Sequence, residues 1–265
     1  MLIFEEALIL GIIQGISEWL PISSEGMTSL VMINFFGKSL AEALPISIWL
    51  HIGTMFAAIV FLRKDIYGIL RNIPRYAKRE SLEKNVNATT TFLIISTILT
   101  GIIGLPLILF AVGFTDFSGK AATAFIGVLL IVTGFLQRKA AGREEVLKRI
   151  GIIDSFIVGI VQGFSALPGI SRSGITVSAL LLRKFDAERA LRLSFLMSIP
   201  AVFAAEVGLL LMDMIVFDVN SLAAIVSSFV FGLLTISALF RVAKKIDFSW
   251  FCIVLGVLSI AVFFV

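Results

Sequence analysis

The chain has 265 residues, of which 58% are apolar and only 15% are charged. Its mean hydropathy is +1.05, whereas an ordinary soluble domain carries about 25% charged residues. This composition excludes a soluble globular enzyme and a nucleic-acid-binding module, and the single cysteine excludes a disulfide scaffold. It favours an all-α polytopic membrane protein, because helices satisfy their own backbone hydrogen bonds inside a bilayer.

The elements predicted along the chain are six spanning helices and two interrupted ones. The first is interrupted: an apolar arm over residues 4–20 is followed by a break at 21–26 and a short arm at 27–36. Spans at 43–62, 89–112 and 121–136 come next. A second interrupted element covers an arm at 152–167, a break at 168–174 and a short arm at 175–182. The last spans are 191–212, 222–240 and 248–265.

The short arms are too short to cross a bilayer. Their eight to ten residues, at about 1.5 Å per residue, cover roughly half of a ~30 Å hydrocarbon core. An irregular break at membrane depth persists only when it is buried in protein or lines a wet cavity. We therefore predict two re-entrant helix–loop–helix hairpins in addition to six transmembrane helices.

The positive charges support this topology independently of helix length. Connections at 63–84, 138–149, 183–192 and 241–245 hold seven, five, four and three of the 22 Lys and Arg residues. If both hairpins re-enter, all of these charges fall on one side, which the positive-inside rule makes cytoplasmic. The prediction is a multi-pass protein of the cell membrane, with cytoplasmic connections at about 63–87 and 138–150.

The two hairpins share a sequence pattern. IQGISEWLPISSEGMT begins at Ile13 and VQGFSALPGISRSGIT begins at Val161, with about a dozen matches in register after a one-residue slip. The similarity continues into the following span, where His51 matches Ser198. Because three spans separate the hairpins, the halves are inverted in the membrane, and such repeats place a site near the midplane. We predict one domain, 1–265, with repeat halves of about 1–137 and 151–265.

The breaks have the composition of an anion site. Gly26 and Gly174 are expected where the short helices start, with free backbone N–H groups and the positive end of the helix dipole facing the cavity. Arg172 is the one Lys or Arg inside a hydrophobic hairpin, and its guanidinium suits a phosphate or carboxylate. The alternative is a structural Arg172 paired with Glu18 or Glu25.

Further polar residues are expected around the same cavity. Glu18 follows Gln14 by one helical turn and is interpreted as a base, a metal ligand or the counter-ion of Arg172. His51 is either catalytic or a neutral interhelical hydrogen-bonding group. Glu206 is an intramembrane carboxylate without an assigned role. Hydroxyl groups that can bond phosphate oxygens, or act as a nucleophile, are supplied by Ser23, Ser24, Ser171, Ser173 and Thr176.

The blocks QGISEWLPISSEG and LPGISRSGIT, with LHIGTMFAA between them, resemble the undecaprenyl-diphosphatase family, which is known for bacitracin resistance. The resemblance covers nearly the whole chain. It implies a membrane phosphatase that converts a polyprenyl diphosphate to the monophosphate, uses Mg²⁺ or Ca²⁺, and opens its site to the outer face. The implied partners are the lipid substrate and the bilayer, with no nucleic acid; a homodimer is a further prediction.

The resemblance also implies roles for matching residues. Gln14 and Glu18 match the family's Glu/Gln-x-x-x-Glu pair, with Glu18 as the metal ligand, and Ser24 matches the proposed nucleophile. The first motif departs from the family at Glu25 and at Met27, where the family has a histidine that is a proposed acid–base group. Either Glu25 or His51 is expected to substitute for it, or the chain is a divergent member with a different lipid or weaker turnover. The predicted substrate-binding residues are Gln14, Ser23, Gly26, Ser171, Ser173, Gly174 and Thr176, and the predicted catalytic ones are Glu18, Ser24, Arg172, Glu25 and His51.

The sequence thus predicts phosphoryl transfer from a prenyl diphosphate, with Ser24 or a water molecule activated by Glu18 or Glu25 as the nucleophile. Two other functions stay open. Inverted repeats with broken helices are also used by carriers, so a flippase for a phosphorylated lipid is one alternative, and a carrier for a small anion is another.

Overall fold

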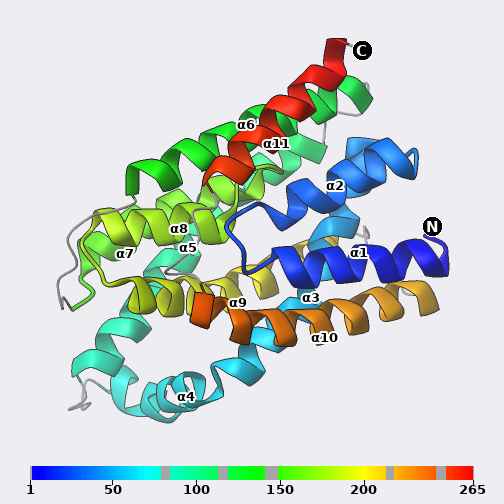
Figure 1. Cartoon of the computed structure of the whole chain (residues 1–265). Helices are drawn as coiled ribbons and strands as arrows, with labels where there is room; N and C mark the ends of the chain where they lie inside the picture. Colours follow the sequence, from blue (N-terminus) through cyan, green and yellow to red (C-terminus); the bar gives the residue numbers. More distant parts are fainter. Residues whose placement is uncertain are drawn as a thin grey trace.

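The computed structural model describes residues 2–78, 84–112, 119–140, 149–212, 218–242 and 249–264, and all regular structure within these ranges is helical (Figure 1). The predicted cytoplasmic connection at 138–150 lies mostly outside the described residues. In chain order, the helices of the first half are α1 (Phe4–Ser17), α2 (Ser24–Phe35), α3 (Leu40–Phe61), α4 (Arg63–Ala77), α5 (Lys84–Val112) and α6 (Gly119–Ala140). Those of the second half are α7 (Ile152–Gly163), η1 (Phe164–Ala166), α8 (Arg172–Leu182), α9 (Ala187–Leu211), α10 (Val219–Val242), α11 (Ser249–Ala261) and η2 (Val262–Phe264).

Five of these helices are long and apolar enough to cross a membrane, namely α3, α5, α6, α9 and α10. They coincide with five of the six predicted spans, and the chain is therefore a multi-pass α-helical membrane protein. The predicted span at 248–265 is different. Its α-helix, α11, has 13 residues before the 3-10 turn η2, so the helix covers only about 20 Å of depth.

Both interrupted elements form helix–break–helix pairs, and each break has a local cause. Leu20 and Leu167 precede prolines, which disfavours the α conformation; Leu167 accordingly has φ −91° and ψ 128°. After each proline the chain turns through a residue with positive φ, Ser23 at 65° in the first break and Gly169 at 104° in the second. Glycine adopts such a conformation readily, whereas serine does so only when its surroundings hold it there.

The two halves of the chain exchange packing partners. Helix α1 packs along α10, and α7 packs along α5, so the long arm of each hairpin lies on a spanning helix of the other half. Helices α6 and α11 pack against each other (Figure 1). Their crossing is close because a Cβ atom at Gly127 would lie 2.6 Å from the carbonyl oxygen of Gly256. This interleaving brings the two breaks toward the centre of the molecule.

A buried tryptophan next to the first break fixes its position. Trp19 is fully buried, donates its indole N–H to the carbonyl oxygen of Gly232 at 2.7 Å, and packs its ring 4.9 Å from that of Phe195. It belongs to an apolar cluster contributed by α3, α9 and α10. Packing of this residue anchors the preceding Glu18 between helices of both halves.

Candidate functional site

The two breaks are joined by direct hydrogen bonds. The backbone N–H of Gly169 in the second break donates to the Ser23 hydroxyl oxygen in the first at 3.0 Å. The Ser173 hydroxyl donates to the carbonyl oxygen of Leu20 at 3.1 Å. These bonds link residues about 150 positions apart in the sequence, so the meeting of the two breaks is a specific tertiary contact.

Helix α6 supports both breaks from one side. Thr133 donates its hydroxyl to the Gly169 carbonyl oxygen at 3.1 Å and accepts the Ser171 N–H at 3.2 Å. One turn later, Gln137 donates its amide to the Pro21 carbonyl oxygen at 2.5 Å. Neither residue is among the predicted site residues. Their i, i+4 spacing on an otherwise apolar helix was the available signal, because polar groups at that spacing share one face.

The short helices start with matching caps. The Ser23 side chain accepts the Gly26 N–H at 3.2 Å, and the Ser171 side chain accepts the Gly174 N–H at 3.1 Å. Gly26 and Gly174 lie in the first turns of these helices, as expected, but the expectation that their own N–H groups are free is wrong. Helices α2 and α8 begin at Ser24 and Arg172, and the two glycine N–H groups are consumed by the serine caps, as at ordinary helix N-termini.

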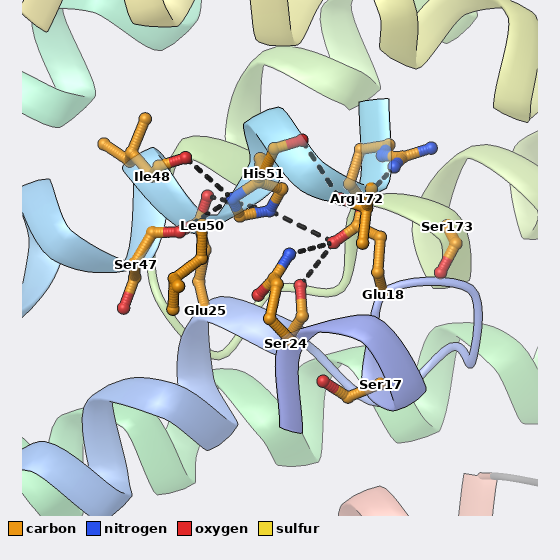
Figure 2. A network of polar contacts seen from close by, with 12 residues as sticks. Ser17, Glu18, Ser24, Glu25, Ser47, Ile48, Leu50, His51, Arg172 and Ser173 are labelled. Atoms are coloured by element: carbon orange, nitrogen blue, oxygen red, sulfur yellow. Dashed lines mark hydrogen bonds and ion pairs between the residues drawn. The ribbon is translucent and has the colours of Figure 1, made fainter. Parts of the chain in front are cut away.

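Glu18 is the centre of a polar network (Figure 2). Its Oε2 accepts hydrogen bonds from the Ser24 hydroxyl at 2.6 Å and from the Gln14 amide at 2.9 Å, and it lies 3.1 Å from His51 Nε2. Its Oε1 forms an ion pair with Arg172 Nη2. Glu18 is only 6% exposed, and these four groups supply the donors that a buried carboxylate needs.

His51 is held by acceptors on both sides of its ring. Nδ1 lies 2.8 Å from the Ser47 carbonyl oxygen, and Nε2 lies between Glu18 and Glu25, with Glu25 Oε1 at 4.0 Å. Because both ring nitrogens face oxygen atoms, there are two possible protonation states. Either both nitrogens carry a proton, or Nε2 carries none and accepts a hydrogen bond from a protonated Glu18. His51 therefore approaches the carboxylates, as its match with Ser198 in the other half predicts.

Arg172 pairs with Glu18, which is the structural alternative predicted for it. Besides the pairing with Glu18, its Nη1 donates to the Ser194 carbonyl oxygen at 3.3 Å. Its side chain keeps 14% exposure, however, and it borders both cavities described below. The guanidinium is thus held in position by one carboxylate and one carbonyl while part of it faces open space.

A small polar cavity lies between the breaks. Eight of the predicted residues border it, namely Glu18, Ser23, Ser24, Glu25, His51, Ser171, Arg172 and Ser173. Ser165 and Ile170, which were not predicted, complete its lining. The other four predicted residues, Gln14, Gly26, Gly174 and Thr176, do not border it. Gln14 donates to Glu18 on the side away from the cavity. Gly26 and Gly174 lie in the capped first turns of α2 and α8, and Thr176 follows in the next turn of α8.

Matched hydroxyl pairs tie each short helix to the next span. Thr28 bonds Ser47 at 2.8 Å in the first half, and Thr176 bonds Ser194 at 2.7 Å in the second. All four side chains are fully buried. Thr176 therefore holds α8 to α9, and its predicted contact with a substrate would require it to leave this bond.

A second, mostly apolar cavity of about 390 Å³ extends from the polar one. Helices α5 and α9 supply most of its wall, and Glu25, His51 and Arg172 border it at the end next to the site. Small residues widen it: a Cβ atom at Gly101 or at Gly208 would meet nothing within 4 Å. The arrangement joins a charged pocket to an apolar channel, as a lipid with a charged head group requires.

Glu206 and Cys252 lie outside the polar cavity. Both carboxylate oxygens of Glu206 are buried without a hydrogen-bond partner among the described residues. Cys252 is buried and donates its thiol to the Pro21 carbonyl oxygen at 3.2 Å, so it packs against the first break, as expected for a small packing residue.

The site belongs to a multi-pass membrane protein that holds paired carboxylates, a serine and an arginine at the contact of two helix breaks. Residues 7–260 match the family model of the bacitracin resistance protein BacA, and the chain belongs to this family.

Full-length relatives support the same assignment. The chain is 58% identical to the undecaprenyl-diphosphatase of Methanococcoides burtonii over 265 residues, which is all of both chains. It is 40% identical to that of Methanothrix thermoacetophila, covering 97% of this chain and 95% of the relative. It is 38% identical to that of Haloarcula marismortui, covering 96% and 95%.

Proposed function

We propose that this protein is a membrane phosphatase that releases the terminal phosphate of a polyprenyl diphosphate of the undecaprenyl type and leaves the lipid monophosphate. The observation that carries the proposal is the 2.6 Å hydrogen bond from the Ser24 hydroxyl to Glu18, whose other oxygen is paired with Arg172. A serine bonded to a carboxylate and beside a guanidinium combines a nucleophile, a base and an anion-binding group.

In the proposed reaction, Ser24 Oγ attacks the terminal phosphorus while its proton passes to Glu18 Oε2. The bond from phosphorus to the bridging oxygen breaks, and that oxygen leaves as part of the lipid monophosphate. His51 donates a proton to the departing oxygen and regains one from Glu18, which becomes a carboxylate again. Glu18 then takes a proton from the water that attacks the phosphoserine. The bond from phosphorus to Ser24 Oγ breaks, inorganic phosphate leaves, and the proton returns to Oγ. Charge on the transferring group spreads over its equatorial oxygens, so the nearby guanidinium of Arg172 stabilises the transition state.

His51 replaces the histidine that the family has at the position of Met27. Its Nε2 lies 3.1 Å from Glu18 and 4.0 Å from Glu25, within the range in which a proton can be exchanged directly or through one water molecule. We assign it the role of acid to the leaving oxygen. Glu25 lies on the same side of the ring and borders both cavities.

A divalent cation, Mg²⁺ or Ca²⁺, fits beside these residues when phosphate is present. Among the described residues, no three His, Cys, Asp or Glu side chains are grouped closely enough to hold a metal alone. Glu25 keeps 19% exposure toward the cavities, whereas Glu18 is already contacted by four groups, so Glu25 would be the first protein ligand, with Glu18 second. Such an ion takes its other ligands from phosphate and water and neutralises phosphate charge.

The apolar cavity is the proposed position of the prenyl tail. Its polar end borders Arg172, and its walls of α5 and α9 are apolar along the remaining length. Because the tail comes from the apolar interior of the bilayer, packing contacts with the cavity wall, rather than removal from water, would hold it there. The carrier alternatives use the same cavities but need no nucleophile, and the Ser24–Glu18 hydrogen bond favours hydrolysis.

The proposed membrane arrangement follows from the charge distribution. Hairpins α1–α2 and α7–α8 re-enter from opposite sides of the cell membrane, the connections rich in Lys and Arg are cytoplasmic, and the site opens outward. Helix α11 with η2 forms the sixth crossing, although it is shorter than the others. The two inverted halves form a single domain.

Phosphate release from a prenyl diphosphate tests the proposal. Purified protein in detergent should release phosphate in the presence of Mg²⁺ or Ca²⁺, and Ser24→Ala should abolish a burst of phosphorylated enzyme in rapid-quench samples. Binding of the lipid without release would favour a carrier. Release by Ser24→Ala at the wild-type rate would instead assign the attack to water.

A further inference from the structure

Helix α4 presents three distinct faces. It follows the spanning helix α3 after a single residue and lies at the same end of the bundle as the start of α5 (Figure 1). Among the residues that the structure describes, contacts from other helices reach one of these faces. The apolar and charged residues on the other two faces indicate what surrounds the helix.

The protein-facing stripe contains residues spaced by seven and four positions, which place them on one side of the helix. Asp65 pairs with Arg192 at 2.9 Å, Asn72 donates its amide to the Asn87 side chain at 2.7 Å, and the Tyr76 hydroxyl bonds Thr91 at 2.8 Å. These contacts fix the rotation of α4 about its axis. The directions of its two remaining faces are therefore determined.

The second face is apolar and uncovered. Tyr67, Leu70 and Ile73 are 66%, 58% and 43% exposed and recur every three residues, so they form one stripe. Large apolar side chains gathered on one exposed helix face mark an interaction site. The stripe begins soon after the end of α3, which is itself a candidate membrane span.

The third face is basic. Lys64, Arg71, Arg75 and Lys78 are exposed and follow the 7-4-3 spacing of a single helix face. Of the acidic residues, only Asp65 occurs in this helix, and it is already paired with Arg192. The basic face thus lies beside the apolar face, and α4 has no further acidic residue that could neutralise the positive charge of the basic face.

We propose that α4 lies in the interface of the membrane leaflet at this end of the bundle, with its apolar face in the acyl chains and its basic face on anionic lipid head groups. A strongly amphipathic helix of low net hydrophobicity, with Lys and Arg on its polar face, is the kind that lies in the interface plane. Each Lys or Arg close to an anionic surface adds to the attraction. The partner is therefore the bilayer itself, enriched in lipids with anionic phosphate head groups.

Site-directed fluorescence in nanodiscs tests the placement. In a Cys252→Ser background, Tyr67→Cys and Leu70→Cys are labelled with an environment-sensitive dye, and Lys184→Cys, in the loop after α8, is the aqueous control. In equal parts of phosphatidylcholine and phosphatidylglycerol, we expect blue-shifted emission at 67 and 70 that is quenched by doxyl groups on acyl chains. At 184 we expect quenching by iodide instead.

The lipid preference has its own matched control. Quenching at position 67 by doxyl-phosphatidylglycerol should exceed that by doxyl-phosphatidylcholine at equal mole fraction. The difference should disappear in Arg71→Gln/Arg75→Gln and persist in Lys139→Gln/Lys184→Gln, which removes the same charge elsewhere. Iodide quenching at 67 and 70, or protection from both quenchers as under a second protein copy, would overturn the proposal, and equal quenching by the two lipids would overturn its head-group preference.

Discussion

The two broken hairpins have the same backbone design and opposite chemistry. Each has a proline, a residue with positive φ and a serine cap that accepts the N–H of a glycine. Where the first hairpin has Glu18 and Ser24, the second has Ala166 and Arg172. The recurring caps and turns are what the fold requires, whereas the differing residues supply a base and a nucleophile from one half and positive charge from the other.

The largest effect is expected from removing the charge of the second hairpin. Arg172→Ala should reduce kcat for phosphate release by about 10³-fold, in line with other arginine–phosphate contacts in phosphoryl transfer. Lys184→Ala, two residues after α8, should leave it unchanged. Steady-state release assays measure both, and a near-normal rate in Arg172→Ala would show that the second hairpin contributes only structure.

The second difference between the hairpins is the apolar cavity. In the first hairpin, α1 and α2 contribute only Glu25 to its lining. In the second hairpin, Gln162, Gly163 and several residues that follow them line it. A Cβ atom at Gly101, which lines the cavity, would meet nothing within 4 Å. Gly101→Leu should therefore occupy part of the cavity and raise KM for long prenyl diphosphates severalfold, because the displaced tail atoms lose their packing contacts.

The control for the cavity is Gly68→Leu on α4, where a Cβ atom also meets nothing within 4 Å. It should leave KM unchanged, and a short prenyl diphosphate should be hydrolysed normally by both variants. An equal rise in KM for short and long chains in Gly101→Leu would show that the prenyl tail does not bind in this cavity.

A smaller effect is expected at the two caps, and it should be unequal. Ser23 accepts two N–H groups, from Gly26 and from Gly169, whereas Ser171 accepts one from Gly174. Ser171→Ala should lower the free energy of unfolding by about 1 kcal/mol, and Ser23→Ala by about 2 kcal/mol because a second buried donor is left unpaired. Reversible unfolding in mixed micelles measures the difference; equal losses would contradict the bridging role of Ser23.

Much of the fold could be predicted from the sequence, because length and apolarity determine which helices can span a membrane. The five long spans and both breaks were predicted on that basis. Helix starts were less accurate: the breaks were placed to include Gly26 and Gly174, since glycine signals a turn, but serine capping begins the helices at Ser24 and Arg172. The shortness of α11 was missed because its apolar residues continue through η2.

The site was predicted where one half repeats the pattern of the other. Matching motifs indicated that both breaks face one cavity, and eight of the twelve predicted residues border it. Thr133 and Gln137 were missed because they lie on a span outside the repeated motifs. The apolar cavity could not be predicted, because it arises from the packing of α5 on α9, which the sequence pattern does not specify.

Residues of the two distant hairpins are proposed to act as one catalytic unit. The most direct test compares phosphate release by Glu18→Gln, Arg172→Gln and the double variant under saturating substrate. Residues that act as a unit are strongly non-additive, so the double variant should lose no more activity than the more damaged single variant. Losses that multiply would show that Glu18 and Arg172 act independently and would contradict the account.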